Sequence, residues 1–569
     1  MVGGRTRLAA PTLVLTLLAW AWLRAAPPPP LVATYWSLPP QSWRGSAAFR
    51  VPEDDPAFHL GLESRRDLGV AFSGGGTRSA AATAGELRGL AANHWLPRVR
   101  YITGVSGGSW AAVPFTYTDR PLDTFLPPLV APEALAKAVV EARPPEGSLA
   151  LAIVKSTLLA PGAGEVVKIA GRQALERQDV PQQLRSLAER FVRGSNDQTY
   201  AGMLGDVFIK PLVPGALTRY YTWNAAERDR IKALNPSLSV SDFVTAADDR
   251  PFLIVGGSII ATHPAYDYPR LVPVELTPLY TGVRQEYGSR LGGTYVSPYA
   301  YDAASATVGR DHTVQVAPAS LGRRFTLADM IATSGAAPLL ALFRGQGVPQ
   351  STLGVQFFPA FNPFAIRNDR AEPVAGRLPH GDGGFTDNLG VMPLLARQVH
   401  NIIVFVNAKE PIRDNPSVES LFWALDRQDE AGGDRSMNHV FESGHFDEVE
   451  RGLARAVAEG GAAVYCGTNW KVLPNELYNI AGYEGLNICW VYIQAIPSWT
   501  ARLPMETRKL LTSRGFRNFP WFSTFEQNVP FLIHLKPAQV NLLSQLAAWS
   551  ITNEKSRTAI HDALGTVLD

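Results

Sequence analysis

The chain contains Gly104-Val105-Ser106-Gly107-Gly108 and, shortly before it, Ser73-Gly74-Gly75-Gly76-Thr77-Arg78. The first stretch has the G-x-S-x-G form, in which a serine can lie on a tight strand-to-helix turn with its hydroxyl exposed for attack. The glycine run of the second stretch offers backbone N–H groups that can come close to a developing oxyanion. A nucleophile and oxyanion donors this close in sequence indicate acyl transfer.

Predicted strands and helices flank both stretches. Residues 67–72 predict a short buried strand, and the alanine-rich residues 79–93 predict a helix, so the glycine run lies at a strand-to-helix junction. Residues 99–103 predict a second strand, and residues 110–117 begin the element after the serine. Helix N-termini collect unpaired N–H groups and favour negative charge. An oxyanion would therefore be stabilised at this junction.

The wider pattern predicts an α/β fold. Helical segments alternate with further predicted strands, at 252–260, 273–276, 402–407 and 487–494. Such alternation favours a mainly parallel central sheet with helices on both faces. Residues from about 131 to 212 are helical in pattern, interrupted by prolines, and predict an insertion rather than part of the sheet.

Composition narrows the class of protein. The chain has 569 residues, of which 46% are hydrophobic and 18% charged, so it can bury a sizeable core. The formal net charge is +2, which gives no argument for a nucleic-acid partner. The sequence lacks the C-x-x-C and H-E-x-x-H spacings of metal sites. We therefore expect a globular protein without a metal or cofactor.

The N-terminal segment has the features of a targeting sequence. Residues 8–23 are uncharged, lie between Arg7 and Arg24, and run into Pro27-Pro28-Pro29-Pro30. This segment is just shorter than the ~17–25 residues of a membrane span, but it suits the hydrophobic part of a secretory signal. Pro27 is a poor residue directly after a cleavage site. The pattern favours an uncleaved or slowly cleaved anchor with the bulk of the chain exported, and cleavage stays open.

The sequence contains two cysteines, Cys466 and Cys489. In an oxidising compartment they could form one disulfide. They could equally be two buried thiols on neighbouring strands. Neither is expected to be catalytic.

A third motif, Gly381-Asp382-Gly383-Gly384, lies far along the chain. Glycine-flanked aspartates are usually ordinary turn residues, so the motif alone is weak evidence. It gains weight because a serine nucleophile needs a base.

Together these motifs resemble the patatin-like and cytosolic phospholipase A2 families. The resemblance is carried by Ser-Gly-Gly-Gly-Thr-Arg at 73–78, Gly-Val-Ser-Gly-Gly-Ser-Trp at 104–110 and Asp-Gly-Gly-x-x-x-Asn-Leu at 382–389. Weaker matches follow in order at 274–278, 332–338 and 518–524. The similarity covers roughly residues 65–530. It implies a patatin-like three-layer fold, and the segment at 131–212 matches no motif of these families.

The resemblance also implies a Ser–Asp dyad in place of a triad. Ser106 would be the nucleophile and Asp382 the base; an aspartate is a weak base at its reference pKa of ~3.9, so it would have to be partly desolvated. Arg78 would steady the substrate phosphate or the oxyanion hole, although it could simply bond a nearby carboxylate at the start of its helix. The oxyanion hole would consist of the backbone N–H groups of Gly74, Gly75 and Gly76.

Histidine is the alternative base. His380 lies two residues before Asp382, and a triad of α/β-hydrolase order would use a later histidine, such as His445, His534 or His561. None of these has a recognisable loop context, and Asp382 with the glycine run already fills every role. The dyad is therefore favoured.

These observations predict a calcium-independent serine acyl hydrolase acting on phospholipid or lysophospholipid esters, with membrane lipids as its partners. A transacylase, a neutral-lipid esterase and a non-catalytic lipid-binding protein of the same fold stay open. The expected location is exported or membrane-anchored, in the bacterial periplasm or on the outward face of the inner membrane. We expect four parts along the chain. They are a signal peptide or anchor at 1–26, a Pro-rich linker at 27–60, a catalytic core with its helical insertion at 61–410, and a C-terminal extension packed on that core at 411–569.

Overall fold

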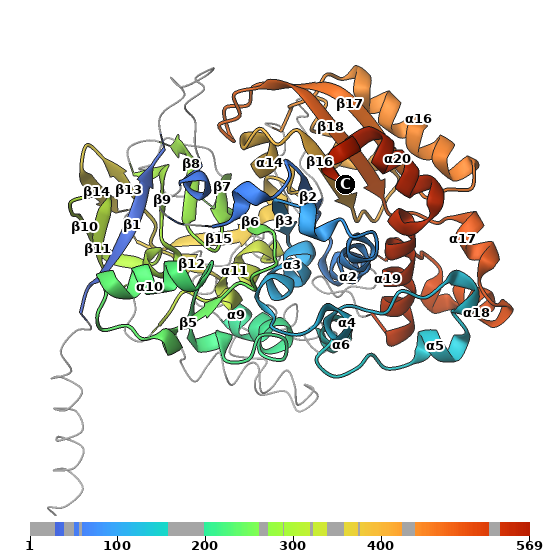
Figure 1. Ribbon diagram of the computed structural model, residues 1–569, viewed down its shortest axis with the longest axis horizontal. Helices are drawn as coiled ribbons and strands as arrows, with labels where there is room; N and C mark the ends of the chain where they lie inside the picture. Colours follow the sequence, from blue (N-terminus) through green and yellow to red (C-terminus); the bar gives the residue numbers. More distant parts are fainter. Residues whose placement is uncertain are drawn as a thin grey trace, which may run out of the picture.

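A computed structural model gives the fold of the chain. It describes residues 29–38, 51–55, 58, 60–156, 199–260, 271–287, 290–318, 323–337, 358–373, 376–423, 438–522 and 535–569. Within these residues the chain forms a 14-stranded sheet flanked by helices, and two small two-stranded sheets (Figure 1). The predicted α/β fold class is confirmed.

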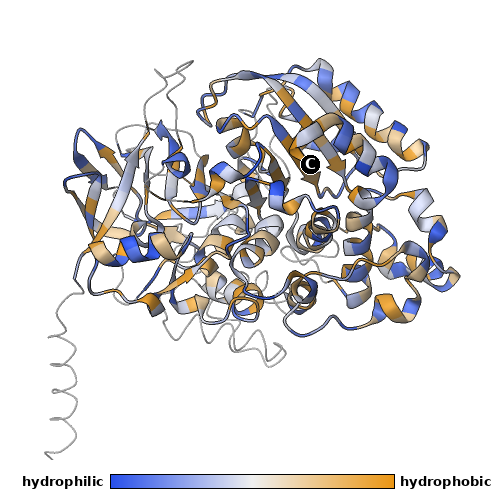
Figure 2. Ribbon diagram, in the orientation of Figure 1, coloured by the Kyte–Doolittle hydropathy of each residue, from blue (hydrophilic) through white to orange (hydrophobic). Residues whose placement is uncertain are grey.

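The centre of the large sheet is parallel. Neighbouring parallel strands there are β6 (Phe252–Ile260), β3 (Tyr101–Val105), β2 (Gly69–Phe72), β16 (Asn401–Val406) and β18 (Tyr483–Tyr492). All residues of β2, β3 and β16 are buried, as expected of strands covered on both faces. Figure 2 shows the strands of this central region largely in hydrophobic colours, whereas α16 (Gly444–Ala458) at the rim alternates between hydrophilic and hydrophobic residues.

Antiparallel strands extend the sheet on both sides of this centre. Beyond β6 the order is β7 (Leu271–Leu276), β8 (Thr281–Tyr287), β9 (Leu291–Val296), β1 (Leu31–Ser37), β11 (Thr313–Pro318) and β10 (Ala303–Val308). Beyond β18 lies β17 (Val464–Val472). Residues 31–37 thus belong to the sheet, and the prediction of a linker over 27–60 is wrong for this part, because β1 pairs with both β9 and β11.

The helix α2 (Gly76–Ala92) packs between α3 (Gly107–Tyr117) and α19 (Pro537–Thr552), and all three lie on one face of the sheet (Figure 1). Small side chains on α2 allow a close approach: the hydroxyl of Ser544 on α19 donates to the carbonyl of Ala81 at 2.8 Å. The C-terminal part of the chain therefore packs directly on the helix that follows the glycine run.

The remaining elements surround this centre. The further helices are α4 (Leu122–Phe125), α5 (Lys137–Glu141), α6 (Leu149–Ser156), α9 (Thr199–Leu204), α10 (Ala225–Leu234), α11 (Leu327–Ser334), α14 (Met392–Ala396), α15 (Pro416–Glu419), α17 (Pro497–Arg502), α18 (Met505–Leu511) and α20 (Glu554–Leu564). The smaller strands are β4 (Tyr220–Thr222), β5 (Phe243–Thr245), β12 (Ala360–Phe361), β13 (Phe364–Arg367), β14 (Arg370–Pro373) and β15 (Leu378–Asp382). Of the predicted insertion, residues 157–198 lie outside the described part of the chain.

The two cysteines form a disulfide between neighbouring strands. Cys466 on β17 lies opposite Cys489 on β18 in the antiparallel register, and the two sulfurs are bonded. The disulfide joins the last two strands at this end of the sheet.

Among the described helices, none combines the length and apolarity needed to cross a bilayer. The predicted signal or anchor at 1–26 lies outside the described residues.

Candidate active site

The G-x-S-x-G stretch forms a sharp turn between β3 and α3. Ser106 lies between the end of β3 and Gly107, the first residue of α3, with φ 50° and ψ −122°. A non-glycine residue with such a φ stores strain, of order 1–3 kcal/mol. The backbone N–H groups of Ser109 and Trp110 donate to the carbonyl of Ser106, at 3.0 and 3.3 Å, and close the turn. This conformation is that of a nucleophile elbow, which presents the serine side chain at the end of the strand.

Strand pairing brings Asp382 to this turn from far along the chain. The strand β3 pairs with residues 252–256 of β6, and β15 pairs with residues 257–259 of the same strand. Strand β7 pairs with one edge of β6, so β3 and β15 both pair with the opposite edge, one after the other along β6. Asp382 is the last residue of β15, so it arrives beside the end of β3, where Ser106 lies.

Ser106 and Asp382 are hydrogen-bonded. The hydroxyl of Ser106 donates to Oδ2 of Asp382 at 2.8 Å. The other carboxylate oxygen, Oδ1, accepts the N–H of Gly384 at 2.7 Å, and the Asp382 carbonyl accepts the hydroxyl of Ser258 at 2.9 Å. Ser106 is 7% exposed and Asp382 3% exposed. The carboxylate is thus held in an orientation in which one oxygen can take the serine proton.

Ser334 fixes the backbone of Ser106, a contact that the sequence analysis did not predict. Its hydroxyl accepts the N–H of Ser106 at 2.9 Å and donates to the carbonyl of Gly256 at 2.7 Å. Ser334 is fully buried at the end of α11. The sequence analysis found only a weak family match at 332–338. The signal for Ser334 in the sequence was its place at the end of a largely apolar segment.

If Ser106 is a nucleophile that attacks esters, Ser334→Ala should lower kcat for ester hydrolysis about 10- to 100-fold while KM changes little, because a displaced nucleophile reacts more slowly. The change leaves the buried N–H of Ser106 without an acceptor, which should cost ~1–3 kcal/mol of stability. Steady-state kinetics on a soluble ester and thermal unfolding measure both effects.

Thr333→Val is the matched control for this experiment. The Thr333 hydroxyl is buried without a partner among the described residues, so its loss should leave kcat within about twofold of wild type. Equal losses of kcat in Thr333→Val and Ser334→Ala would contradict the assignment of Ser334.

The glycine run packs directly against the serine turn. A Cβ on Gly107 would lie 1.8 Å from the carbonyl oxygen of Gly76, so only glycine fits there. A Cβ on Gly74 would lie 3.3 Å from Cβ of Ser106. The run and the serine therefore share one small space.

The N–H groups of the run differ in availability. The N–H of Gly74 donates to the carbonyl of Asn388 at 2.8 Å. Those of Gly75 and Gly76 have no hydrogen-bond partner among the described residues, since Gly76 is the first residue of α2. The helix N-terminus thus offers two N–H donors next to the serine, which is the requirement for binding an oxyanion.

Arg78 is buried beside the run. Its Nε donates to the carbonyl of Asn407 at 3.1 Å and its Nη1 to the carbonyl of Phe522 at 2.5 Å. Burial lowers the pKa of Arg78 to about 10, against the opposing effect of Glu410, so the guanidinium stays charged at neutral pH. Its hydrogen bonds go to two backbone carbonyls, and its contact with a substrate phosphate stays a prediction.

His380 is engaged elsewhere. Its Nδ1 lies 2.8 Å from the carbonyl of Leu378, which can only accept, so Nδ1 carries the proton and Nε2 accepts the Tyr301 hydroxyl at 2.8 Å. Burial lowers the pKa of His380 to about 3. The ring is therefore neutral and a very weak base.

The later histidines also lie away from the serine. His445 contacts Glu448 and His561 contacts Asp569 near the surface, whereas His534 lies outside the described residues. No histidine that the structure describes is hydrogen-bonded to Ser106 or Asp382. Over the same described residues, no group of three or more His, Cys, Asp or Glu is placed to hold a metal ion.

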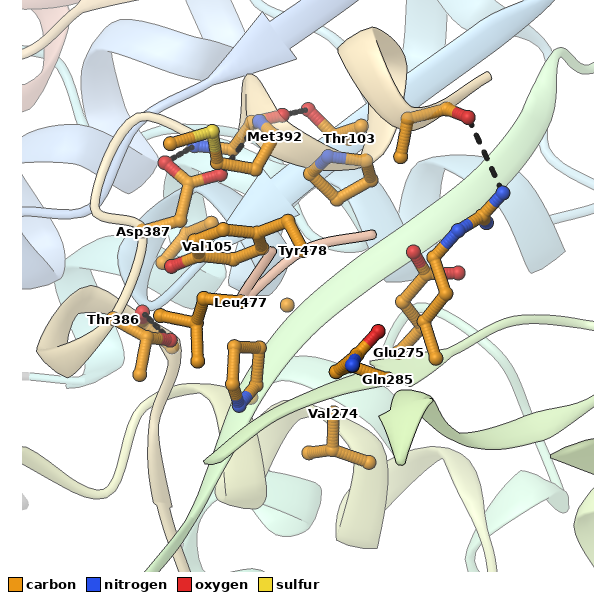
Figure 3. Close-up of a pocket in the computed structure, with 18 residues that line it drawn as sticks. Thr103, Val105, Val274, Glu275, Gln285, Thr386, Asp387, Met392, Leu477 and Tyr478 are labelled. Carbon is orange, nitrogen blue, oxygen red and sulfur yellow. Dashed lines mark hydrogen bonds between the residues drawn. The ribbon is translucent and has the colours of Figure 1, made fainter. Parts of the chain in front are cut away.

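A small cavity lies among residues of β3, β6, β7 and α14 (Figure 3), and its lining includes Val105 and Gly383, the chain neighbours of Ser106 and Asp382. Its volume of about 30 Å³ has room for a water molecule or two and not for an acyl chain. At its wall the carboxylate of Asp387 accepts the N–H groups of Leu389, Gly390 and Met392, and Thr103 on β3 donates to the carbonyl of Gly390. These bonds tie the loop after Asp382 to the strand that precedes Ser106.

Comparison with known proteins gives structural matches alone. No family model matches the chain, and no curated protein matches its sequence. Human GIVD cytosolic phospholipase A2 is one solved structure with a similar fold. It is 12% identical, with a TM-score of 0.44, over 90% of this chain and 63% of that one. The same human enzyme in complex with methyl gamma-linolenyl fluorophosphonate is 15% identical, with a TM-score of 0.38, over 90% of this chain and 62% of that one. This chain thus spans less than two thirds of the length of that protein.

Proposed function

We propose that this protein is a serine acyl hydrolase that cleaves acyl esters of phospholipids or lysophospholipids. The observation that supports this most strongly is the 2.8 Å hydrogen bond from the Ser106 hydroxyl, on a strained turn, to the carboxylate of Asp382. The two open N–H groups of Gly75 and Gly76 beside it add the second requirement of acyl transfer.

The reaction follows from these positions. Oγ of Ser106 attacks the ester carbonyl carbon while its proton passes to Oδ2 of Asp382, and the carbonyl oxygen becomes an oxyanion that the N–H groups of Gly75 and Gly76 bind. Collapse breaks the bond to the leaving alcohol, which takes the proton from Asp382. Water then attacks the acyl-enzyme by the same route, returning the proton to Ser106 and releasing the fatty acid.

Burial of the dyad supports a desolvated reaction site. A weak base suffices when preorganised donors stabilise the oxyanion, since each such donor is worth ~10²–10³ in rate. The lipid substrate itself is proposed from the motif resemblance and from the buried, positively charged Arg78 close to the glycine run.

A lipid panel with product identification tests this function. Purified protein is incubated with phosphatidylcholine, phosphatidylglycerol, their lysolipids and triacylglycerol, and products are separated by mass spectrometry. We expect free fatty acid from the phosphorus-containing lipids at least tenfold faster than from triacylglycerol. Acyl transfer to an added alcohol without fatty acid release would instead indicate a transacylase, and turnover of triacylglycerol alone a neutral-lipid esterase. Ser106→Ala protein is the blank for contaminating lipases.

A further inference from the structure

Glu86 is a buried carboxyl group that the proposed reaction does not use. It lies on α2, ten residues after the start of the helix at Gly76, and is 2% exposed. Its Oε2 lies 3.4 Å from Nδ2 of Asn407, the residue that directly follows β16. Oδ1 of Asn407 is buried without a hydrogen-bond partner among the described residues. The pair is therefore a polar contact inside an otherwise apolar helix packing.

Asn407 in turn holds the glycine run. Its N–H donates to Oγ of Ser73 at 2.7 Å, and its carbonyl accepts Nε of Arg78 at 3.1 Å. Its side-chain Nδ2 also lies 3.4 Å from Oγ of Ser79, which donates to the Ser73 carbonyl. Asn407 is thus hydrogen-bonded to both ends of the 73–78 stretch, and its side chain also lies against the carboxyl group of Glu86.

Among the described residues, no cation is ion-paired with Glu86. The helices α3 and α19, which cover α2, contain no charged residue, nor does β16. The cations on α2 itself are Arg78 and Arg88, and those on two elements packed against α2 are Lys155 of α6 and Arg98 of the 3-10 turn Leu96–Arg98. Arg88 and Lys155 are ion-paired with other carboxylates, and Arg78 donates to backbone carbonyls.

A carboxylate buried without a cation is costly, whereas a neutral carboxylic acid has a proton to donate to an unpartnered acceptor. Burial raises the pKa of Glu86 to about 8, and the polar neighbours Asn407 and Thr83 lower it by less. At neutral pH the group is mostly protonated.

We propose that Glu86 is a positioning residue that acts as an uncharged carboxylic acid, holding Asn407 and, through it, the glycine run that carries the oxyanion donors. Its effect on catalysis rests on the proposed function, whereas its effect on stability does not. Ionisation of Glu86 would place an unpaired charge behind Asn407 and loosen the run. The protein therefore has an alkaline limit that is separate from the dyad.

The test compares wild type with Glu86→Gln, a neutral side chain of the same shape. The second-order rate of labelling by a fluorophosphonate probe is measured at pH 7 and 9 on full-length protein, and corrected for hydrolysis of the probe. With a pKa of about 8, wild type should lose about tenfold in rate between these pH values. Glu86→Gln should match wild type at pH 7 within about threefold and change less than twofold by pH 9. Glu86→Leu, which fills the space without hydrogen bonds, should be slow at both pH values.

Thermal unfolding gives a readout that needs no activity. Because the folded protein keeps a proton that the unfolded chain loses, the stability contribution of Glu86 is fully present below its ordinary pKa of 4.5 and is lost as the pH rises from there through about 8. The midpoint of Glu86→Gln should therefore rise relative to wild type over this range.

Glu227→Gln is the matched control for the labelling experiment. It changes a buried glutamate that is paired with Arg230 far from the run, so this variant should keep the alkaline loss of labelling.

Equal pH dependence of the midpoint in wild type and Glu86→Gln would overturn the proposal, as would wild-type labelling by Glu86→Leu. If wild type is not labelled at any pH, the proposed function fails, and the unfolding experiment still decides whether Glu86 is protonated in the folded protein.

Discussion

Alanine at Ser106 should abolish ester hydrolysis, with a loss of about 10⁴-fold or more in kcat, which is the scale found when a serine nucleophile is removed. Oγ of Ser106 is the atom that would form the acyl-enzyme, and within the described part of the chain its hydrogen bond is to Asp382. Removing it also relieves little strain, because φ of residue 106 stays positive. Hydrolysis of a soluble ester and labelling by a fluorophosphonate probe should both be lost. The circular dichroism spectrum should show that the variant is still folded.

Ser109→Ala is the matched control, because this serine lies three residues further on and is also buried. Its hydroxyl donates to the carbonyl of Ser106 at 2.6 Å, so its loss should cost ~1 kcal/mol of stability while labelling continues. Labelling that survives in Ser106→Ala and is lost in Ser109→Ala would contradict the assignment of the nucleophile.

Asparagine at Asp382 should lower kcat by about 10²–10⁴-fold, the usual contribution of a general base. An amide can still accept the N–H of Gly384, so the loop should keep its shape, but it cannot take the proton of Ser106. Hydrolysis measured at saturating ester separates this loss from a change in binding.

His380→Gln distinguishes the dyad from a histidine-dependent mechanism. His380 bridges the Leu378 carbonyl and the Tyr301 hydroxyl, so its replacement should lower the unfolding midpoint and leave the rate per folded molecule within about threefold of wild type. A near wild-type rate in Asp382→Asn, or a collapse of the rate in folded His380→Gln, would exclude the Ser–Asp assignment.

Much of the site's local structure was predictable because its signals are local. Glycines between an apolar strand and an alanine-rich helix specified the junction at 73–78, and the structure has β2 and α2 on either side of it. The same holds for the turn at Ser106 between β3 and α3. Both turns depend on positions that only glycine or a strained residue can occupy, so the sequence carries the information directly.

Contacts between distant segments were not predictable in this way. Strand β15 pairs with β6 beyond the end of β3, and β1 joins the sheet from a Pro-rich stretch. Both arrangements are pairings between strands far apart in the sequence. Pairing partners depend on tertiary packing rather than on local propensity. The buried hydrogen bonds of Ser334 and Asn407 likewise depend on the positions of neighbouring strands.

The location of a covalent adduct tests the central claim most directly. After wild-type protein reacts with a fluorophosphonate probe, tandem mass spectrometry of the tryptic peptide 101–137 can locate the added mass, since Ser106 and Ser109 are its only serines. We predict one adduct, on Ser106, formed at a rate that falls at least a hundredfold in Asp382→Asn. An adduct on Ser109 or on another peptide, or equal rates in the two proteins, would contradict a nucleophile activated by Asp382.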